Sequence, residues 1–473
     1  MKIILFELNE VPPRILDAFC QTYPDSTFAR MLPLSVRADT VNEDNVPLSP
    51  WITWPTLHRG VTHERHGIGH LGQPIDAANK AYPSLWAIAA EAGARVGVGG
   101  SLHSYPVPER SGNYDFYLPD TFAPDSQAIP ASLEAFQAFN LAMVSESARN
   151  VSTKINMGIA AGMLPHLPAL GFGAGTAGAV LKQLLSERVR IERKVRRRTL
   201  QAELAFDAFM AHLGAAKPAL ATFFTNHVAS AMHRFWGAAY PQEFEKLDYD
   251  QTWIKSFGAE IDAAMIAADR MLRRLKRFVD SRSDYALVVA SSMGQAACSG
   301  VAMLNQLAIS DLQKFLAVAG VPADTWVRRP AMHPHYSFEV RPEHAAAFEA
   351  GLQRMTQALS RMTADKDYTD ISYERRGDFF HLALDVYNLD AGRARLPLGD
   401  GFLPLADAGL GLMETDFQQG CTGYHVPEGV LLVYGVGFAP KNMGEMSTCD
   451  IAPSILAMMD IARPGHMRKP VSF

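Results

Sequence analysis

The sequence predicts an α/β protein in which a doubly wound, mostly parallel sheet is covered by helices on both faces. Apolar runs too short for helices indicate buried strands, and they lie at residues 3–8, 95–99, 219–225, 286–290 and 430–434. Helical patterns separate these runs, and such alternation is typical of a parallel sheet with two covered faces. We therefore expect a ligand site beyond the carboxyl ends of the strands.

The clearest helical pattern precedes the fourth of these predicted strands. Apolar residues recur there at spacings of three and four, which is the period of one helix face. They are Ile254, Phe257, Ile261, Met265, Ala268, Leu272, Leu275 and Val279. We expect a helix over residues 254–279, packed against the sheet.

The length of 473 residues suits one large domain that spans residues 1–473 and carries insertions. We expect a helical insertion at about residues 104–215 and a second insertion at about residues 300–400. The formal net charge of −5 gives no general attraction to nucleic acid, so we expect no nucleic-acid partner. The pattern does not indicate an oligomeric state.

The cysteines and the N-terminus favour a cytoplasmic location. The four cysteines are widely spaced and form no Cys-x-x-Cys pair, which argues against a disulfide framework and a thiolate zinc site. The first residues have the pattern of a strand rather than that of a secretory leader.

An apolar stretch and a basic run stand out at residues 155–198. Residues 155–181 carry no formal charge, and the basic run contains Arg188, Arg190, Arg193, Lys194, Arg196, Arg197 and Arg198. This combination is compatible with peripheral contact with a membrane. However, Pro165 and Pro168 would disrupt a spanning helix, and the basic run also fits the solvated face of a helix. A cap packed on the domain is the favoured interpretation.

Oxygen-bearing side chains follow the first predicted strand, where Glu7, Asn9 and Glu10 lie at or beyond its carboxyl end. A hard cation can be bound by such side chains. Taken alone, these residues are more typical of ordinary loop and capping chemistry.

A helix is predicted to begin at Ser49-Pro50, because serine is a good N-cap and proline suits the first helical position. A hydroxyl at a helix N-terminus faces unpaired backbone N–H groups, which favour an anionic phosphoryl or sulfuryl group. Ser49 is therefore a candidate nucleophile, and Thr53 is the alternative. By itself the motif is usually only a cap.

Imidazoles occur at two further strand ends. Asn226 and His227 close the predicted strand at 219–225, His233 follows in the next helix, and His425 precedes the last strand. Imidazoles placed in this way can converge on a metal, although each alone is often structural.

In chain order these pieces resemble the alkaline phosphatase superfamily, and within it the type I phosphodiesterase and nucleotide pyrophosphatase branch. The resemblance runs from residue 1 to about residue 465, outside the insertions. The matching motifs are Gly60 with His66-Gly67-Ile68, His233-Arg234-Phe235-Trp236, residues 286–291 with Gly294, His425 within Gly-Tyr-His-Val-Pro-Glu-Gly, and Asp450-Ile451-Ala452-Pro453-Ser454.

The resemblance implies a hydroxyl nucleophile and divalent ions, but several metal positions depart from the family pattern. Asn9 stands where the family has an aspartate, and Ser292-Met293 replace an Asp-His pair. Because these are poor ligands for zinc or manganese, we expect one ion rather than two. That ion would be held by His233 and His425 with Asn226 or His227, while Glu7 or Glu10 would replace the missing aspartate as base or ligand.

The resemblance implies a hydrolase, or a transferase of the same chemistry, that acts on a phosphoester or phosphodiester. Its substrate would be a phosphorylated small molecule or a glycan-linked or lipid-linked phosphate. A sulfatase is disfavoured because there is no Cys-x-Pro-x-Arg sequence. The alternative is a pseudoenzyme, a binding or scaffold protein whose metal chemistry has been lost, and membrane association is compatible with either.

Overall fold

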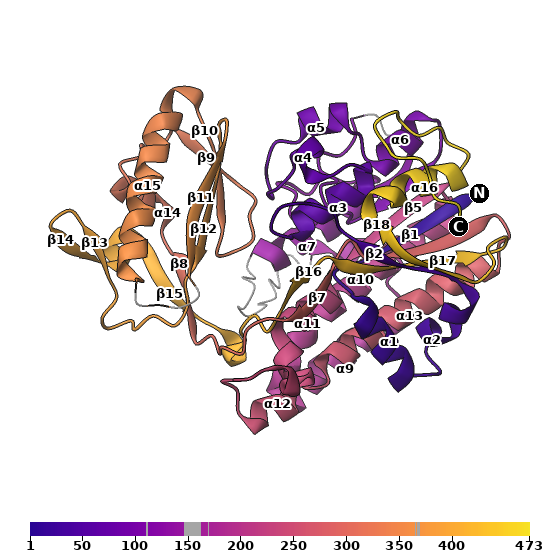
Figure 1. Ribbon diagram of the computed structural model, residues 1–473, viewed down its shortest axis with the longest axis horizontal. Helices are drawn as coiled ribbons and strands as arrows, with labels where there is room; N and C mark the ends of the chain where they lie inside the picture. The colour runs from indigo at the N-terminus through magenta and orange to yellow at the C-terminus, as the bar shows by residue number, and fades with distance from the viewer. Residues whose placement is uncertain (110–111, 146–161, 169, 365, 367–368) are drawn as a thin grey trace.

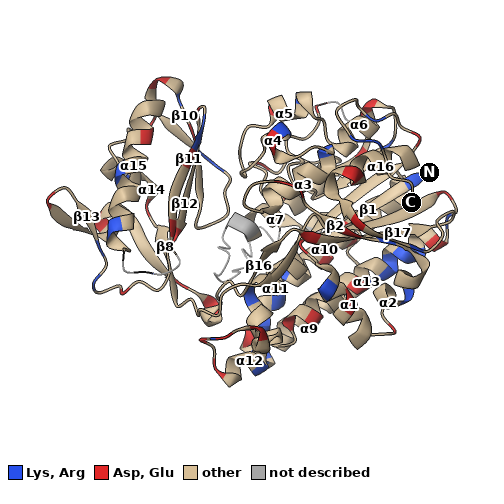
Figure 2. Ribbon diagram, in the orientation of Figure 1, with Lys and Arg blue, Asp and Glu red and all other residues tan. Residues whose placement is uncertain are grey.

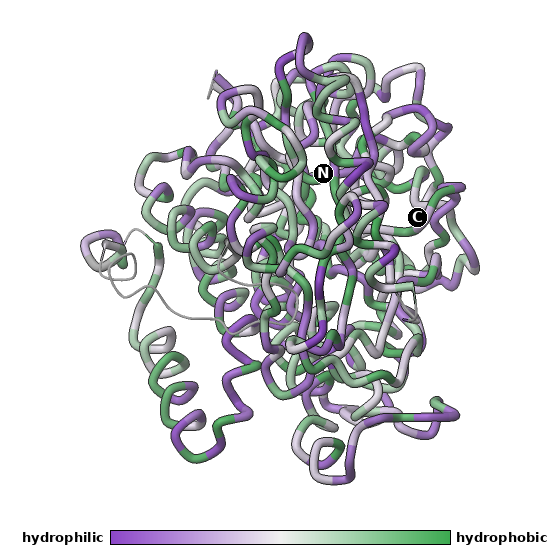
Figure 3. Tube along the Cα trace, turned by 90° about the vertical axis from the view of Figure 1, so that its left-hand side faces the viewer, coloured by the Kyte–Doolittle hydropathy of each residue, from purple (hydrophilic) through white to green (hydrophobic). Residues whose placement is uncertain are grey.

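The computed structural model describes residues 1–109, 112–145, 162–168, 170–364, 366 and 369–473. They form a large lobe, which contains both termini, and a smaller lobe beside it (Figure 1). The large lobe is built on an eight-stranded sheet in the order β18-β2-β17-β6-β1-β5-β3-β4. In Figure 3 hydrophilic segments, in purple, run along many of the outer loops, whereas much of the interior is green.

The expected doubly wound, mostly parallel sheet is confirmed. Neighbouring strands β6, β1, β5, β3 and β4 run parallel, as do β2 and β18. The bounds are β1 (Lys2–Leu8), β2 (Val36–Val41), β3 (Val96–Gly99), β4 (Tyr114–Leu118), β5 (Leu220–Thr225), β6 (Tyr285–Ala290), β17 (Glu428–Gly435) and β18 (Lys441–Ser447).

One strand departs from the parallel arrangement expected for it. β17, predicted at residues 430–434, is antiparallel to both β2 and β6. The chain enters it from β16 (Gly423–Val426), which lies at the carboxyl edge of the sheet, so it crosses the sheet in the opposite direction.

Two apolar cores cover the two faces of the sheet. Ile4 and Phe6 of β1 pack in one core, and the alternate residues Ile3 and Leu5 pack in the other, as the period of a strand requires. Helices of the first core are α1 (Pro13–Thr22), α2 (Thr27–Met31), α10 (Arg197–Ala216), α11 (His227–Ala239), α12 (Gln251–Phe257) and α13 (Glu260–Asp280). Helices of the second are α3 (Pro50–Arg59), α6 (Leu85–Glu91) and α16 (Ile451–Met458).

The helix expected over residues 254–279 is divided into α12 and α13 around Gly258. A Cβ at Gly258 would lie 2.9 Å from the Ile254 carbonyl oxygen and 3.2 Å from that of Ala238. The chain therefore passes close to α11 where the two helices meet, and the apolar period continues across the break.

The smaller lobe, residues 305–414, has a core of its own. A four-stranded sheet in the order β11-β12-β10-β9 packs against α15, and β8 pairs with β15. The elements are β8 (Asn305–Ile309), α14 (Leu312–Val318), β9 (Trp326–Arg329), β10 (Tyr336–Val340), α15 (Ala345–Met362), β11 (Asp370–Arg376), β12 (Phe379–Asp385), β13 (Arg395–Leu398), β14 (Gly401–Pro404) and β15 (Leu410–Glu414).

The insertion expected at about residues 104–215 contributes helices to the large lobe. They are α7 (Glu134–Ser145), α9 (Ala174–Val189) and α10, and α10 packs into the first core. Part of the basic run is neutralised locally, since Arg193 and Arg196 pair with Glu260 and Arg197 pairs with Glu187. Acidic and basic positions lie near one another on these helices (Figure 2).

Membrane contact is the alternative role expected for the apolar stretch of this insertion. Residues 155–161 of its apolar stretch lie outside the described residues. Among the helices that are described, none combines the length and the apolar character that crossing a membrane requires.

Candidate functional site

A cavity of 860 Å³ lies at the carboxyl edge of the large sheet, between the two lobes. Its large-lobe wall comes from the segment after β1, the N-terminus of α3, the start of α11, and β16. Its small-lobe wall comes from β11, β12 and the segment that precedes β10. Of the residues expected to share a site, Asn9, Ser49, Asn226 and His425 all line this cavity.

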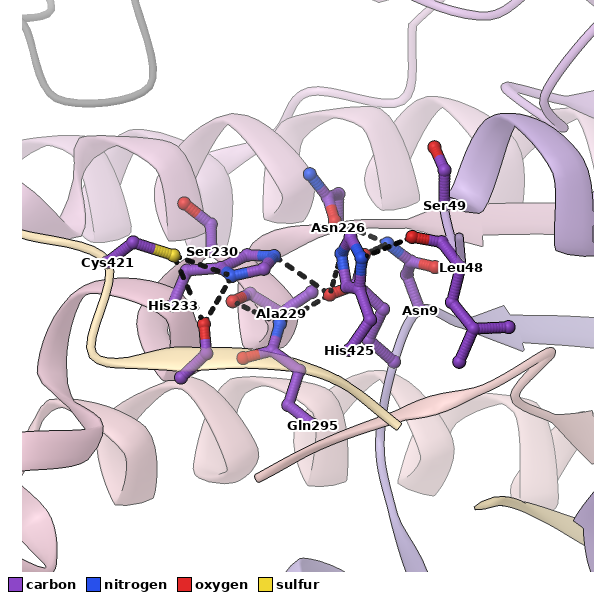
Figure 4. Close-up of polar contacts among 12 residues, drawn as sticks. Asn9, Leu48, Ser49, Asn226, Ala229, Ser230, His233, Gln295, Cys421 and His425 are labelled. Atoms are coloured by element: carbon purple, nitrogen blue, oxygen red, sulfur yellow. Dashed lines mark hydrogen bonds and ion pairs between the residues drawn. The ribbon is translucent and has the colours of Figure 1, made fainter. Parts of the chain in front are cut away.

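Glu10, His233 and His425 converge on one wall of the cavity. Figure 4 shows the imidazole rings of His233 and His425 close to each other. Glu10 Oε2 lies 2.9 Å from His233 Nε2 and 3.5 Å from His425 Nε2. Within the described part of the chain, this is the group of histidine, cysteine and acidic residues that could hold a metal ion, with ligand atoms within 4.8 Å of one another.

Backbone carbonyls fix the orientation of both imidazoles. His233 Nδ1 donates to the carbonyl of Gly423 at 2.7 Å, and His425 Nδ1 donates to the carbonyl of Leu48 at 2.7 Å. Because a carbonyl only accepts, each Nδ1 carries a proton, and each neutral ring then presents the Nε2 lone pair to Glu10. Two lone pairs facing a carboxylate require a proton or a cation between them. The donor set therefore fits a divalent ion, whose histidine ligands usually donate their other N–H in this way.

Without an ion, the same groups form a buried proton-sharing cluster. Burial acts to raise the pKa of Glu10, but the charges of His425 and His233 and hydrogen bonds from His233 and Gln295 bring it down to about 2. Burial acts to lower the pKa of His233, but Glu10 and the hydrogen bond with Cys421 raise it to about 9. An ion that binds here at neutral pH must therefore displace a proton from His233.

The Asn9 amide orients Glu10 instead of facing the ion position. Trp54 Nε1 donates to Asn9 Oδ1 at 2.7 Å, and an indole N–H only donates, so the amide nitrogen points the other way. That nitrogen donates to Glu10 Oε1 at 2.8 Å and to Asn226 Oδ1 at 2.7 Å. Asn9 and Asn226 were both expected among the metal ligands. In the structure the Asn9 amide instead holds Glu10 in position, and Asn226 lies at the cavity wall.

The backbone of Glu10 adopts a left-handed conformation, with φ of +59°. This region is uncommon for residues other than glycine, and such strain concentrates at functional sites. Gln295 of β7 (Gly294–Ala297) also donates to Glu10 Oε2. Gln295 was not anticipated from the sequence, because no motif distinguishes it from other polar residues near strand ends.

Ser49 caps α3 as expected, and its hydroxyl accepts from the Trp51 N–H at 3.4 Å. It lines the cavity, and the residue before it, Leu48, anchors His425. The alternative nucleophile, Thr53, lies in the interior, where its fully buried hydroxyl is 2.8 Å from Ser292 Oγ. The structure thus places Ser49 at the wall of the cavity that contains the candidate metal position, whereas Thr53 does not line that cavity.

Two other candidates are turned away from the cluster, which corrects their expected roles. His227 uses one ring nitrogen with Thr225 Oγ1 at 2.7 Å and the other with the Ala264 carbonyl at 3.0 Å, so neither faces an ion. Glu7 points to the opposite face of the sheet, because strand residues alternate, and lies 2.7 Å from His58.

No family model and no curated protein matches the sequence. Murine ectonucleotide pyrophosphatase/phosphodiesterase 5 is among the similar solved structures, at 12% identity and a TM-score of 0.43 over 98% of this chain and 97% of that chain. Wild-type alkaline phosphatase PafA is 13% identical, with a TM-score of 0.46 over 99% and 98%. Phosphonoacetate hydrolase from Sinorhizobium meliloti 1021 is 13% identical, with a TM-score of 0.41 over 98% and 95%.

Proposed function

We propose that this chain is a phosphoester or phosphodiester hydrolase, or a transferase of the same chemistry, of the alkaline phosphatase superfamily, and that it uses one zinc or manganese ion. The convergence of Glu10, His233 and His425 beside the N-terminus of α3 carries the proposal. A capped helix terminus favours an anionic group, and an ion held a short way from it favours the same group.

Each residue has a proposed role in this site. Glu10, His233 and His425 would hold the ion, which would supply Lewis-acid stabilisation of a phosphoryl oxygen. The Ser49 hydroxyl would attack phosphorus, and the first N–H groups of α3 would bind phosphoryl oxygens.

Arg198 would add a positive charge on the same side of the cavity. It lines the cavity and donates to Ser230 Oγ at 3.0 Å, and Ser230 precedes His233 on α11. A guanidinium pairs well with phosphate oxygens, so it offsets part of the charge that a second ion supplies in two-metal enzymes.

Metal-dependent hydrolysis tests this function. Protein purified without a chelator or an affinity tag should contain close to one zinc or manganese ion per chain. It should hydrolyse 4-nitrophenyl phosphate or bis(4-nitrophenyl) phosphate, lose this activity with a chelator and regain it when the ion is returned. Bound metal with no turnover of either ester would favour the binding-protein alternative, and protein that binds no metal would contradict the proposed site.

We further propose a peripheral membrane contact through α9 and the segment after it. Apolar side chains are exposed at Leu181, Leu184, Leu185, Val189 and Ile191, and exposed cations lie among them at Lys182, Arg188 and Arg190. Exposed apolar groups with flanking cations favour binding to an anionic membrane surface, because insertion of the apolar groups and attraction of the cations add together. Either signal alone gives only marginal attachment.

Vesicle flotation tests this contact. The protein should float with vesicles that contain phosphatidylserine at low salt, and Leu181→Asp combined with Leu185→Asp should abolish flotation. Val436→Asp removes an equally exposed apolar side chain elsewhere, at 65% exposure, and should have no effect. An absence of flotation at low salt, or equal loss in both variants, would argue that this segment is only a cap.

A further inference from the structure

The smaller lobe presents the polar face of its sheet to the cavity. Along β12, Phe380, Leu382 and Leu384 pack into the core of that lobe. The alternate residues His381 and Asp385 line the cavity, together with residues of β11 that pair with them. A polar sheet face normally faces solvent, whereas this one forms a wall opposite the Glu10 cluster.

A chain of hydrogen bonds with a fixed direction runs across this wall. His335 Nε2 lies 2.8 Å from Asp385 Oδ2, His381 Nε2 lies 3.2 Å from His335 Nδ1, and Ser337 Oγ lies 2.9 Å from His381 Nδ1. Because the carboxylate only accepts, His335 donates to it, and with His335 in its neutral form each next group donates to the one before. Tyr387 donates to the other oxygen of Asp385 at 2.8 Å. Each of these N–H and O–H groups is thus engaged within the chain, and the carboxylate oxygens of the wall remain as acceptors for a ligand.

Burial disfavours the charged form of three imidazoles at this wall. Burial lowers the pKa of His381 to about 2 and that of His333 to about 4, and it also lowers the pKa of His70. His70 belongs to the large lobe, stacks on His381 at 4.1 Å between ring centroids and lies 2.7 Å from Glu374 Oε2, so it ties the two lobes together.

The fixed charges of the wall are mainly negative. Asp370, Glu374 and Asp385 line the cavity, and Arg376, which lines it beside them, donates to Glu374 and to the Gly67 carbonyl. A second phosphate or another anion would be repelled here. The carboxylate oxygens are acceptors to which the hydroxyl groups of a neutral ligand can donate.

The opposite side of the cavity supplies an apolar surface. Leu48, Trp51 and Phe122 line it, and the last two rings pack edge to face at 4.9 Å. A ring with an apolar face and hydroxyl groups on its rim matches a cavity with one aromatic side and one hydrogen-bonding side. The volume of 860 Å³ leaves room for such a group beside a phosphoryl group.

We propose that the smaller lobe selects the alcohol portion of the substrate, and that this portion is an uncharged, polyhydroxylated group such as a sugar residue. Its phosphoryl group would face Glu10, His233 and His425, and its hydroxyl groups would bind along Asp385, His335 and His381. This inference rests on the proposed function, since it names the substrate class of the same site.

Matched esters test the inference separately from the proposed function. A hexose phosphate and cyclohexyl phosphate share a six-membered ring but differ in hydroxyl groups, and ATP and phosphoethanolamine add negative and positive charge. A site built to bind hydroxyl groups discriminates strongly against analogues without them, so we expect kcat/KM to favour the hexose ester over cyclohexyl phosphate by about 100-fold or more.

Variants of the wall show which of its side chains cause the preference for the hexose ester. Asp385→Asn should lower kcat/KM for the hexose ester by about 10-fold or more, and it should lower kcat/KM for 4-nitrophenyl phosphate, which has no hydroxyl group to bind there, by much less. Asp370→Asn is a second variant whose exposed side chain lines the cavity, and it should reduce the preference without affecting folding. Asp400→Asn, exposed on the β13–β14 turn, is the matched control and should change nothing.

Equal turnover of hexose and cyclohexyl esters, or better turnover of ATP or phosphoethanolamine, would overturn the inference while leaving the hydrolase intact. If no ester is hydrolysed, the proposed function fails, and calorimetric titration with the hexose phosphate still decides the inference. Binding that Asp385→Asn weakens supports it, and binding that is absent or unaffected contradicts it.

Discussion

Replacing His425 by alanine should remove the bound ion and turnover together. The imidazole supplies one of the three ligand atoms, and the methyl group of alanine cannot replace it. Loss of only a hydrogen-bond partner of a ligand commonly lowers metal affinity by about 10-fold to 100-fold, so loss of the ligand itself should exceed that range. Metal analysis and calorimetric titration with zinc measure the effect.

Met293→Leu is the matched control for this experiment. Met293 is fully buried and follows Ser292 in the chain, and leucine has a similar volume. Neither metal content nor turnover should change by much. If folded Met293→Leu lost its turnover, or if His425→Ala kept its ion, the ion would lie near Ser292 and the assigned site would be wrong.

Local hydrogen bonds support a single ion. In the region of Asn9 and Ser292, Thr53 bonds with Ser292 and the Asn9 oxygen accepts from Trp54. These neutral groups satisfy one another, and an ion there would have to break those bonds without gaining a charged ligand.

The strands and their ends could be predicted because both depend on local pattern. Apolar runs such as residues 286–290 are fully buried. A strand that is buried on both faces consists almost entirely of apolar residues, so it can be recognised in the sequence. Since the carboxyl ends of parallel strands share one edge of the sheet, the approach of Asn9 to Asn226 also followed from the pattern.

The orientation of the candidate ligand side chains could not be predicted from the sequence. It depends on how the helices and strands pack, and no local sequence pattern contains that information. His227 and His233 both lie on α11, which begins at His227, and six positions along a helix place two side chains about 120° apart around its axis. Both side chains line the cavity, but only His233 presents a ring nitrogen to Glu10, and the sequence does not say which of the two does so. The role of Glu10 as a ligand likewise depends on its left-handed backbone, which turns its carboxylate toward the histidines.

The polar wall of the smaller lobe was not predicted because it requires knowledge of how an insertion folds back. The alternation in β12 shows that one face is polar, but a polar face is by default solvated. Its position opposite the Glu10 cluster is set by contacts distant in sequence, such as that between His70 and Glu374.

Replacing the Ser49 hydroxyl should abolish turnover while the ion remains bound. Ser49 also caps α3, so alanine would additionally cost about 1 kcal/mol of stability through the lost cap. Ser49→Asn separates the two roles, because asparagine caps a helix as well as serine does but offers no hydroxyl nucleophile. We expect kcat to fall by about 1,000-fold or more in both variants, with metal content unchanged.

Thr53→Val is the matched test of the other hydroxyl. Valine has nearly the shape of threonine but cannot bond with Ser292, so the variant should lose stability, on the order of 1 kcal/mol, and keep its turnover. Thermal unfolding measures the first effect and steady-state kinetics the second. A Ser49→Asn protein that turns over at the wild-type rate would remove Ser49 from the mechanism, and a folded Thr53→Val protein without activity would make Thr53 the nucleophile instead. With both hydroxyls dispensable, the attacking group would have to be a water molecule activated at the ion.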